Sequence, residues 1–343
     1  MTSYLKFCLT PFYLFLMATS LVIDGWIGLS IAFLVVVSIV VGELSLGDDI
    51  STPNYRFPFL LDFSLFINVP LFLVLLYLYL DKVSNSFEWY YLLYIPILGL
   101  LMALSLINIG HELVHRTSKK FDCEVGNWAL ATAWNPAFAI EHVYGHHKNI
   151  GIVEEDPVTA TYGENPISFA FKAFFKEHTH AWGIETRQLK RRKQSILSFH
   201  NRILNGYLRT FIVFGLIGYF FSWQAMVIYI SLGIVANYIF QLTNFIEHYG
   251  LVRIKGKPVQ YHHSWNSNHV ISNWILFHLP WHSHHHKSMN KAFHELEPID
   301  NAPQMPFGYP AMIVIAFFPF VFIPLMERQL KLYQEREEKV VTV

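Results

Sequence analysis

Hydrophobic residues are concentrated in six long runs, and short polar stretches separate most of them. A membrane-spanning helix needs roughly 20 mostly apolar residues, and each run is close to that length. The predicted spans are residues 7–23, 26–41, 57–80, 90–109, 207–223 and 225–245. The pattern therefore predicts an all-α integral membrane protein with six transmembrane helices.

A further apolar stretch, residues 311–325, is shorter and contains Pro319 and Pro324. Its length and its two prolines favour a segment that lies in the membrane interface or packs on the bundle, rather than a seventh crossing. From Glu327 onward the chain is charged and has a helical pattern. We expect this tail to be solvated.

The composition agrees with a membrane protein, since 53% of the residues are hydrophobic and only 15% are charged. The formal net charge is zero, so the charge balance gives no indication of a nucleic-acid partner. Lys and Arg are concentrated between spans four and five and after span six, whereas the other side carries only short turns such as residues 81–88. The positive-inside rule then places both termini and all the histidines in the cytoplasm.

No Gly/Ser/Pro-rich linker divides the chain, and we expect one membrane-bound domain over residues 1–343. Spans one to four lie within residues 1–110, and a cytoplasmic segment covers 111–206. Spans five and six lie within 207–246, and a second cytoplasmic segment covers 247–343.

The candidate chemistry comes from histidine, which occurs 18 times and never before residue 111. Ten of these residues lie in four clusters beside predicted spans. Neutral imidazole is a good ligand for transition metals near neutral pH, so this clustering predicts a membrane-embedded metalloenzyme. The clusters are His111-Glu112-Leu113-Val114-His115, Glu141-His142-Val143-Tyr144-Gly145-His146-His147, Glu247-His248 and His282-Ser283-His284-His285-His286.

The spacing within the clusters places several imidazoles together. His111 and His115 are four residues apart, as are His142 and His146, and residues at this spacing share one face of a helix. His282, His285 and His286 show a similar pattern. With His147 and His248 the candidates number nine, too many for one metal, and they indicate two metal ions. Imidazole ligands favour iron, copper or zinc over magnesium or calcium.

The same residues also allow other interpretations. The string His111-Glu-Leu-Val-His115 alone would fit a zinc peptidase with Glu112 as the base, but this leaves the other clusters unused. Taken alone, His248 is more often a structural histidine. The carboxylates beside the candidates suit second-shell partners, because a metal-bound histidine usually donates its other N–H to a carboxylate or carbonyl. These second-shell candidates are Glu112, Glu141, Glu247 and Asp156, together with His269 near the last clusters. Direct bridging of the metals is the alternative for the three glutamates. Asp156 also suits a plain turn, and His269 also suits packing.

The remaining histidines lack ligand spacing. We expect His178, His180, His200 and His294 to lie at the surface, while His262, His263 and His278 suit either packing or second-shell roles. The two cysteines, Cys8 and Cys123, are too far apart in sequence for a four-cysteine iron site or a zinc ribbon.

From about residue 108 to 312 the chain resembles the integral-membrane alkane 1-monooxygenases of the fatty-acid desaturase/hydroxylase superfamily. The motifs that carry this resemblance are the His111–His115 and Glu141–His147 boxes, Glu155-Asp156-Pro157, and Asn244-Phe-Ile-Glu-His-Tyr-Gly-Leu251. The last string distinguishes alkane hydroxylases from desaturases.

The resemblance implies a monooxygenase with a cytoplasmic, histidine-rich cap that holds a non-haem di-iron centre. It also implies terminal hydroxylation of medium- or long-chain n-alkanes, taken from the lipid bilayer, to primary alcohols with dioxygen. Electrons would come from rubredoxin and its reductase, since the chain has no flavin or NAD fingerprint. The expected location is the bacterial inner membrane. Carried over by position, the nine iron ligands are His111, His115, His142, His146, His147, His248, His282, His285 and His286.

Two positions at the last histidine box depart from the family pattern, as does the stretch Trp134-Asn135-Pro136 before the second box. His284 stands where the family usually has an acid, and Trp281 stands where it has an arginine. Both changes bear on second-shell contacts, the reduction potential or partner docking, and they leave the ligand positions intact.

Alternative functions remain within and outside the superfamily. The substrate could instead be a fatty acyl or alkyl-aromatic compound that is hydroxylated or desaturated. A non-catalytic metal-binding or transport protein is the alternative from another class. Transport predicts ionisable residues inside the spans, and the six spans are nearly free of them. Chain-length preference and oligomeric state are not determined by these patterns.

Overall fold

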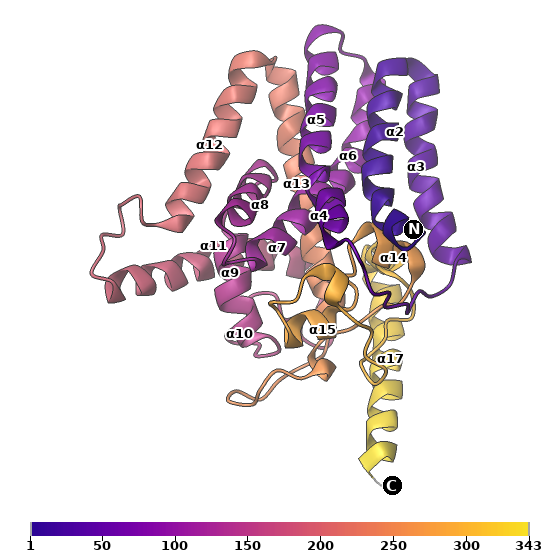
Figure 1. Ribbon diagram of the computed structural model, residues 1–343, viewed down its shortest axis with the longest axis vertical. Coiled ribbons are helices and arrows are strands. Elements are labelled where there is room, and N and C mark those ends of the chain that lie inside the picture. Colours follow the sequence, from indigo (N-terminus) through magenta and orange to yellow (C-terminus); the bar gives the residue numbers. More distant parts are fainter. Residues whose placement is uncertain (1, 342–343) are drawn as a thin grey trace.

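The computed structural model describes residues 2–341, and helices dominate this part of the chain (Figure 1). These residues contain no β-strand. Their β-type pairing consists of two isolated bridges, one between Asp48 and His269 and one between Asn266 and Gln304. The all-α fold class predicted from the hydrophobic pattern is confirmed.

Within the described residues, six helical segments are long and apolar enough to cross a membrane, as predicted. They run over Ser3–Ile23, Gly25–Ser45, Pro58–Asn85, Trp89–His115, Arg202–Phe220 and Trp223–His248. Their elements are α1 (Thr2–Leu5), η1 (Lys6–Cys8), α2 (Leu9–Ile23), α3 (Gly25–Ser45), α4 (Pro58–Phe66), α5 (Asn68–Asn85), η2 (Trp89–Leu93), α6 (Tyr94–Met102), η3 (Ala103–Ile107), α7 (Asn108–His115), α12 (Arg202–Phe220) and α13 (Trp223–His248).

The fourth and sixth segments are longer than the hydrophobic runs that predict them. The runs end at residues 109 and 245, whereas the helices continue to His115 and His248. Hydropathy alone ends these spans early because it treats histidine and glutamate as residues outside the membrane. The extra turns carry His111, His115 and His248 on the ends of rigid helices.

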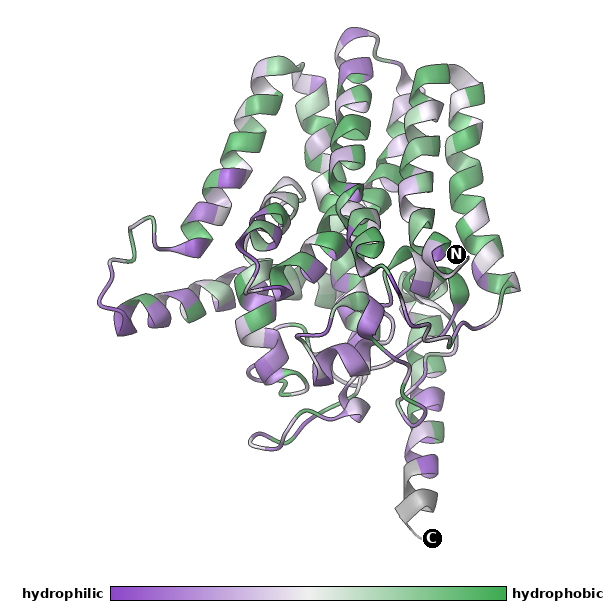
Figure 2. Cartoon of the chain, viewed as in Figure 1, coloured by the Kyte–Doolittle hydropathy of each residue, from purple (hydrophilic) through white to green (hydrophobic). Residues whose placement is uncertain are grey.

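The other helices surround the lower end of this bundle, where hydrophilic residues gather below the hydrophobic upper part (Figure 2). Between the fourth and fifth segments lie α8 (Lys120–Thr132), α9 (Phe138–Glu141), η4 (His142–His146), α10 (His147–Asn149) and α11 (Pro166–Arg191). After the sixth lie η5 (Tyr261–His263), α14 (Val270–Ile275), α15 (His282–Lys287), η6 (Phe293–Glu295), α16 (Tyr309–Ala316) and α17 (Pro319–Val341).

Asp24 alone separates α2 from α3, and its side chain ties this turn to the neighbouring helices. Its backbone has φ 61° and its carboxylate accepts a hydrogen bond from the backbone N–H of Gly25. The same carboxylate accepts from Lys82 at 2.7 Å and from the hydroxyls of Tyr90 and Tyr91 at 2.8 and 2.9 Å. These contacts fix the polar end of the bundle opposite the histidines.

Two glycines allow α7 and α8 to pack closely, and this contact positions the first histidine cluster. A Cβ atom at Gly110 would lie 2.7 Å from Leu130, and one at Gly126 would lie 3.0 Å from Leu113. Real Cβ atoms essentially never approach to 2.7 Å, and 3.0 Å is tighter than most contacts, so a side chain at either position would force its neighbours to shift. The absence of side chains at this crossing therefore sets how near α8 lies to the turn that carries His111.

The last apolar stretch forms α16 and the start of α17, with a break before Pro319. Helix α16 packs against α13 and α17. The stretch is not among the segments that could span a membrane, in agreement with the sequence interpretation. Helix α17 continues through Glu327 and projects away from the bundle (Figure 1).

Candidate metal centre

The nine predicted ligand histidines come together in two groups at the lower end of the bundle. Within each group, the candidate ligand atoms lie within 4.8 Å of one another. All nine residues are buried, with at most 6% of each exposed. One group contains His111, His115, His142, His147 and His285, and the other contains His146, His248, His282 and His286.

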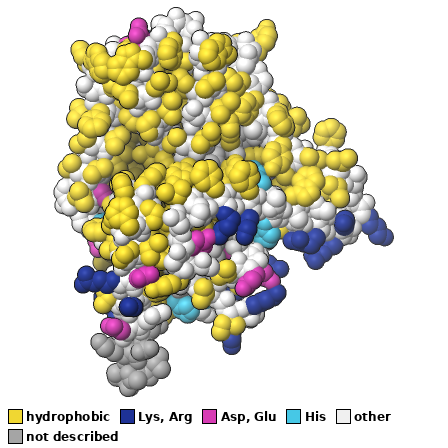
Figure 3. Space-filling model, turned by 180° about the vertical axis from the view of Figure 1, so that it is seen from behind, with side chains coloured by type: hydrophobic (Ala, Val, Ile, Leu, Met, Phe, Trp, Pro, Cys, Tyr) yellow, Lys and Arg dark blue, Asp and Glu magenta, His cyan; other side chains and the backbone are white. Residues whose placement is uncertain are grey.

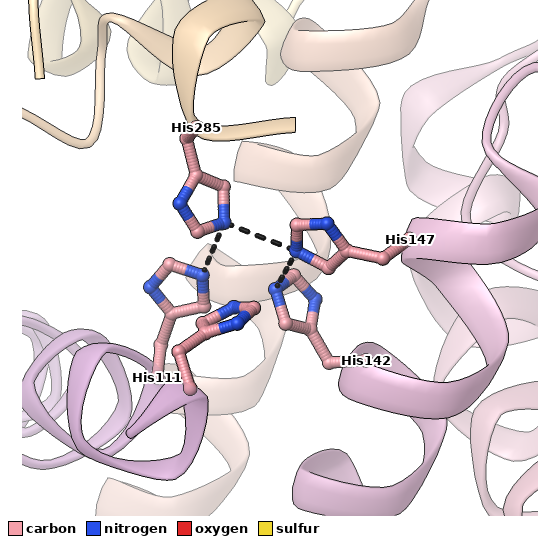
Figure 4. Close-up of side chains that lie close together, drawn as sticks. His111, His142, His147 and His285 are labelled. Carbon is pink, nitrogen blue, oxygen red and sulfur yellow. Dashed lines mark hydrogen bonds between the residues drawn. The ribbon is translucent and has the colours of Figure 1, made fainter. Parts of the chain in front are cut away.

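The first group joins three parts of the chain, and its ring nitrogens point inward (Figure 4). The Nε2 atom of His285, from α15, lies 3.0 Å from that of His111 and 3.1 Å from that of His147. The Nε2 atoms of His147 and His142 are 3.1 Å apart. His115 packs edge-on against His111 and His147, and both of its ring nitrogens lack a hydrogen-bond partner.

The second group joins η4, the end of α13 and α15. The Nε2 atom of His282 lies 2.9 Å from that of His286 and 3.2 Å from that of His248. The Nε2 atoms of His146 and His286 are 3.3 Å apart. Where these Nε2 atoms present their lone pairs, a shared cation between them would stabilise the arrangement.

The division of the histidines between the two groups differs from what α-helical spacing predicts, since that spacing places His142 and His146 on one face. Residues 142–146 form a π turn, where hydrogen bonds join residues five apart instead of four. His142 and His147 therefore face the first group, while His146 faces the second. In α15, His282 and His286 are four apart and face the second group, while His285 faces the first.

Two of the rings in the second group are held from behind through Nδ1. His146 Nδ1 lies 2.9 Å from the carboxylate of Asp156, which also accepts a hydrogen bond from Thr159 at 2.6 Å. His248 Nδ1 lies 3.3 Å from the carbonyl oxygen of His263. Both contacts leave Nε2 as the free nitrogen, which is the arrangement that orients a metal ligand.

The electrostatics of the histidines outside the spans favour their neutral form. Burial, and then the neighbouring histidines, lower the pKa of His142, His147, His282, His285 and His286 well below the ordinary value. Burial also opposes protonation of His146, but the adjacent Asp156 raises the pKa of His146 above its ordinary value. Five of the nine imidazoles thus present a free lone pair near neutral pH.

The other predicted second-shell acids have varied contacts. Glu247 accepts a hydrogen bond from the Tyr309 hydroxyl at 3.0 Å, and its other oxygen lies 3.4 Å from His282 Nε2. Glu112 accepts from Arg116 at 3.1 Å and from the backbone N–H of Phe293 at 3.3 Å. Glu247 therefore reaches the second group directly, while the hydrogen bonds of Glu112 tie α7 to the segment that follows α15.

Glu141 has no hydrogen bond to a ring of either group and instead lies 3.1 Å from His180 Nδ1. Burial, and then the nearby Asp156, raise the pKa of Glu141. His180, expected at the surface, is half-buried and forms this contact. The structure places His269 outside both groups, with its Nδ1 3.1 Å from the Ser267 hydroxyl and 3.7 Å from Asp48. His269, directly before α14, therefore packs beside the loop after α3 and has no contact with either group, which favours packing over the second-shell role.

Sequence reasoning missed the hydroxyl of Tyr309, and it gave His263 a packing or second-shell role without identifying its carbonyl as the group involved. The carbonyl of His263 and the hydroxyl of Tyr309 both act beside the second group, and neither lies in a histidine cluster. A carbonyl has no residue-type signature, and Tyr309 is far from Glu247 in sequence. His284, the departure from the family pattern, turns away from both groups and accepts a hydrogen bond from the backbone N–H of Glu297 at 2.8 Å.

An apolar cavity of about 740 Å³ ends at the two groups. His111 and His142 of the first group and His282 of the second contribute to its wall, as does Glu247. Phe138 stacks on His142 with the ring centroids 4.6 Å apart and forms part of the same wall. Most of the remaining lining is aliphatic or aromatic. The cavity thus brings a hydrocarbon surface directly to the candidate metal ligands.

Comparison with known proteins places these features in context. Residues 87–316 match the fatty acid desaturase family model. An alkane 1-monooxygenase from Pseudomonas putida is 36% identical over 71% of this chain and 61% of its own length. Alkane 1-monooxygenase 1 from Alcanivorax borkumensis is 38% identical over 67% of this chain and 57% of its own length.

A more distant relative acts on a different class of compound. The hydroxylase component of xylene/toluene monooxygenase from Pseudomonas putida is 26% identical over 70% of this chain and 64% of its own length. The chain thus spans only about three fifths of the length of the curated relatives it matches.

Proposed function

The chain belongs to the fatty acid desaturase family, and from this membership we propose that it hydroxylates the terminal methyl group of medium- or long-chain n-alkanes to primary alcohols, with dioxygen as the oxidant. The observation that carries the proposal is the apolar cavity that ends at both histidine groups. The similarity to alkane 1-monooxygenases supports the same substrate class.

The nine histidines are proposed to hold two iron ions, one in each group. Three features fit such a pair: converging Nε2 atoms, the buried and unpartnered ring nitrogens of His115, and a donor set made of imidazoles. Bound iron would supply the redox chemistry that activates dioxygen. Asp156 and the His263 carbonyl then serve to orient His146 and His248.

The cavity would position an alkane by shape, because the substrate has no polar group to bind. Burying each CH₂ from water contributes about 0.8 kcal/mol, but an alkane that leaves lipid gains far less. Selection of the chain end therefore depends on how the walls confine the hydrocarbon. Phe138, stacked on His142, would hold the terminal methyl beside the first group and exclude water from it.

Electrons are proposed to come from rubredoxin with its reductase, at the cytoplasmic side of the bacterial inner membrane. A basic hollow beside η4 suits an acidic donor protein, since complementary charge speeds encounter. Its cations are Lys148, Arg187, Arg191 and Arg192. In Figure 3, Lys and Arg gather on the lower side of the molecule, away from the hydrophobic upper part.

The test is a reconstituted assay of the purified protein with rubredoxin, its reductase, NADH and n-alkanes of several lengths. Gas chromatography follows the products, and iron is measured per chain. Primary alcohols, together with one iron per histidine group, are expected, and a His285→Ala/His286→Ala variant should lose both. Iron without alcohol from any alkane would overturn the substrate assignment. Absence of iron would overturn the di-iron assignment.

A second substrate class has one specific observation in its favour, the similarity to the hydroxylase component of xylene/toluene monooxygenase. The same assay should therefore include xylene. An aromatic alcohol formed faster than any alkanol would assign the chain to alkyl-aromatic hydroxylation. Turnover of either substrate would exclude a non-catalytic metal-binding role.

A further inference from the structure

The apolar cavity reaches the surface of the molecule through exposed hydrophobic residues. Val40 of α3, Ile234 of α13 and Val314 of α16 line the cavity and are 43%, 58% and 55% exposed. These residues belong to helices of the bundle or to helices packed on it. The cavity therefore opens sideways toward lipid, on a face where hydrophobic side chains surround a hollow (Figure 3).

Three aromatic rings form a continuous row along the rim of this opening. Phe171 of α11 lies 6.0 Å from Tyr238 of α13, and Tyr238 lies 5.5 Å from Phe317, measured between ring centroids. All three residues line the cavity. Phe171 and Phe317 are 60% and 43% exposed, so their outer faces are free to contact lipid.

The two outer rings lie exposed at the edge of the cavity, but the backbone beneath them is held differently. Phe317 lies in the break between α16, which ends at Ala316, and α17, which begins at Pro319. Phe171 is on α11, which leaves the bundle and runs at a steep angle to the spans (Figure 1). Opening at Phe171 would therefore come from rotation of its exposed side chain, whereas Phe317 also lies on backbone outside a regular helix.

We infer that Phe171, Tyr238 and Phe317 form an aromatic gate through which a straight hydrocarbon chain passes from the lipid into the cavity. The inference rests on the proposed function, because it takes the cavity to be the alkane site. The rings would part for a narrow unbranched chain and obstruct a bulky one. Movement of Phe171 and Phe317 would then control the rate of entry.

The test measures entry without turnover or metal. Ala103 lines the cavity and is 8% exposed, and Ala103→Cys introduces a small reactive thiol there. Cys8 and Cys123 are first replaced by serine. N-Dodecylmaleimide, which partitions into lipid, then labels the introduced thiol in nanodiscs, and mass spectrometry gives the rate. Phe171→Ala and Phe317→Ala should each raise this rate several-fold, whereas Phe171→Trp should lower it.

Matched controls separate the gate from general effects of exposed aromatic residues. Phe175 lies one turn from Phe171 on α11 and is 66% exposed, and Phe320 on α17 is 77% exposed; neither lines the cavity. Phe175→Ala and Phe320→Ala should leave the labelling rate unchanged. A thiol introduced on the surface by Phe211→Cys, on α12, should be labelled equally fast in every variant.

The outcomes distinguish the gate from the proposed function. If the gate variants are labelled at the same rate as the Ala103→Cys parent while Val40→Ala accelerates labelling, entry lies between α3 and α13 and the gate is overturned. Equal acceleration by Phe171→Ala and Phe175→Ala would also overturn it. Faster labelling in the gate variants supports the gate even if the reconstituted protein hydroxylates no alkane, since labelling requires only an open path.

Discussion

At the residue scale, the two nitrogens of each imidazole have separate tasks. The inner nitrogen points into the group, and the outer one determines how firmly the ring is oriented. Asp156 holds the outer nitrogen of His146, and a backbone carbonyl holds that of His248. The outer nitrogens of His282 and His286 have no such partner. The orientation of the second group therefore depends mainly on Asp156 and the loop that carries His263.

Replacing Asp156 with asparagine should weaken metal binding while leaving the fold intact. The substitution removes the negative charge that makes His146 a stronger base. Removal of such partners typically lowers metal affinity about 10–100-fold, and we expect a decrease in metal affinity of that size here. Competition with a chelator of known affinity gives the measurement. Glu155→Gln is the matched control, because Glu155 pairs with Lys255 at the surface. Equal affinities of the two variants would contradict the orienting role.

Residue identity alone indicated much of this centre. The nine histidines and Asp156 stood out because imidazole clusters beside apolar runs are unusual, and a nearby acid suits the second shell. His269 was a second-shell candidate because it is close to the last clusters in sequence. In the structure its ring lies beside Ser267 and Asp48 instead. The carbonyl of His263 could not be predicted, since every residue carries one.

At the element scale, local helix geometry decides which histidines act together. An uninterrupted α-helix over residues 138–149 would place His142 and His146 on one face. The π turn η4 widens the helix there, so His147 takes the place beside His142 and His146 turns to the other group. One extra residue in a turn thus divides a single histidine box between two sites.

The crossing of α7 and α8 provides a test at the same scale. Gly126→Val should destabilise the protein, because the added side chain would overlap Leu113 and push α7 away. Overpacking of this kind typically costs about 1–3 kcal/mol. Metal affinity should also fall, because α7 carries His111 and His115. The measurement is the thermal unfolding temperature in nanodiscs, followed by iron content.

Gly215→Val is the control for that substitution. Gly215 lies on α12, and no atom lies within 4 Å of a Cβ placed there. Its variant should unfold within a degree or two of the wild type, given that surface substitutions usually change stability by about 0.5 kcal/mol or less. If both valine variants unfold at the same temperature, close packing at Gly126 is not what positions α7.

At the scale of the whole molecule, the metal centre joins segments that are far apart in sequence. Helices α7, α13 and α15 and the η4 segment each supply ligands to at least one group. Bound metal should therefore stabilise the packing of the histidine-bearing segments on the bundle. We therefore expect metal content to affect the global stability of the protein.

Removal of metal by a chelator should lower the unfolding temperature of the whole protein. A ligand that binds only the folded state and is present at 100 times its Kd contributes about 2.7 kcal/mol. The temperature should recover when ferrous iron is restored. In a His285→Ala/His286→Ala variant, which lacks one ligand from each group, the chelator should have a much smaller effect. An unchanged unfolding temperature in the wild type would show that metal is not coupled to folding.

The sequence alone determined the six spans, the all-α class and the nine candidate ligands. These properties depend on local patterns, namely the length of apolar runs and the spacing of histidines along helices. Local patterns did not give the ends of the spans correctly, because α7 and α13 continue past their apolar runs through His115 and His248. A helix ends where its hydrogen bonding ends, which hydropathy does not report.

Only the tertiary structure decided how the histidines divide into groups of five and four, and which polar groups hold them. It alone placed the cavity against His111, His142 and His282, and brought Phe171, Tyr238 and Phe317 together at its rim. The physical reason is that such contacts join residues far apart in the chain. Their distances depend on how helices pack, and that packing has no signature in any single segment.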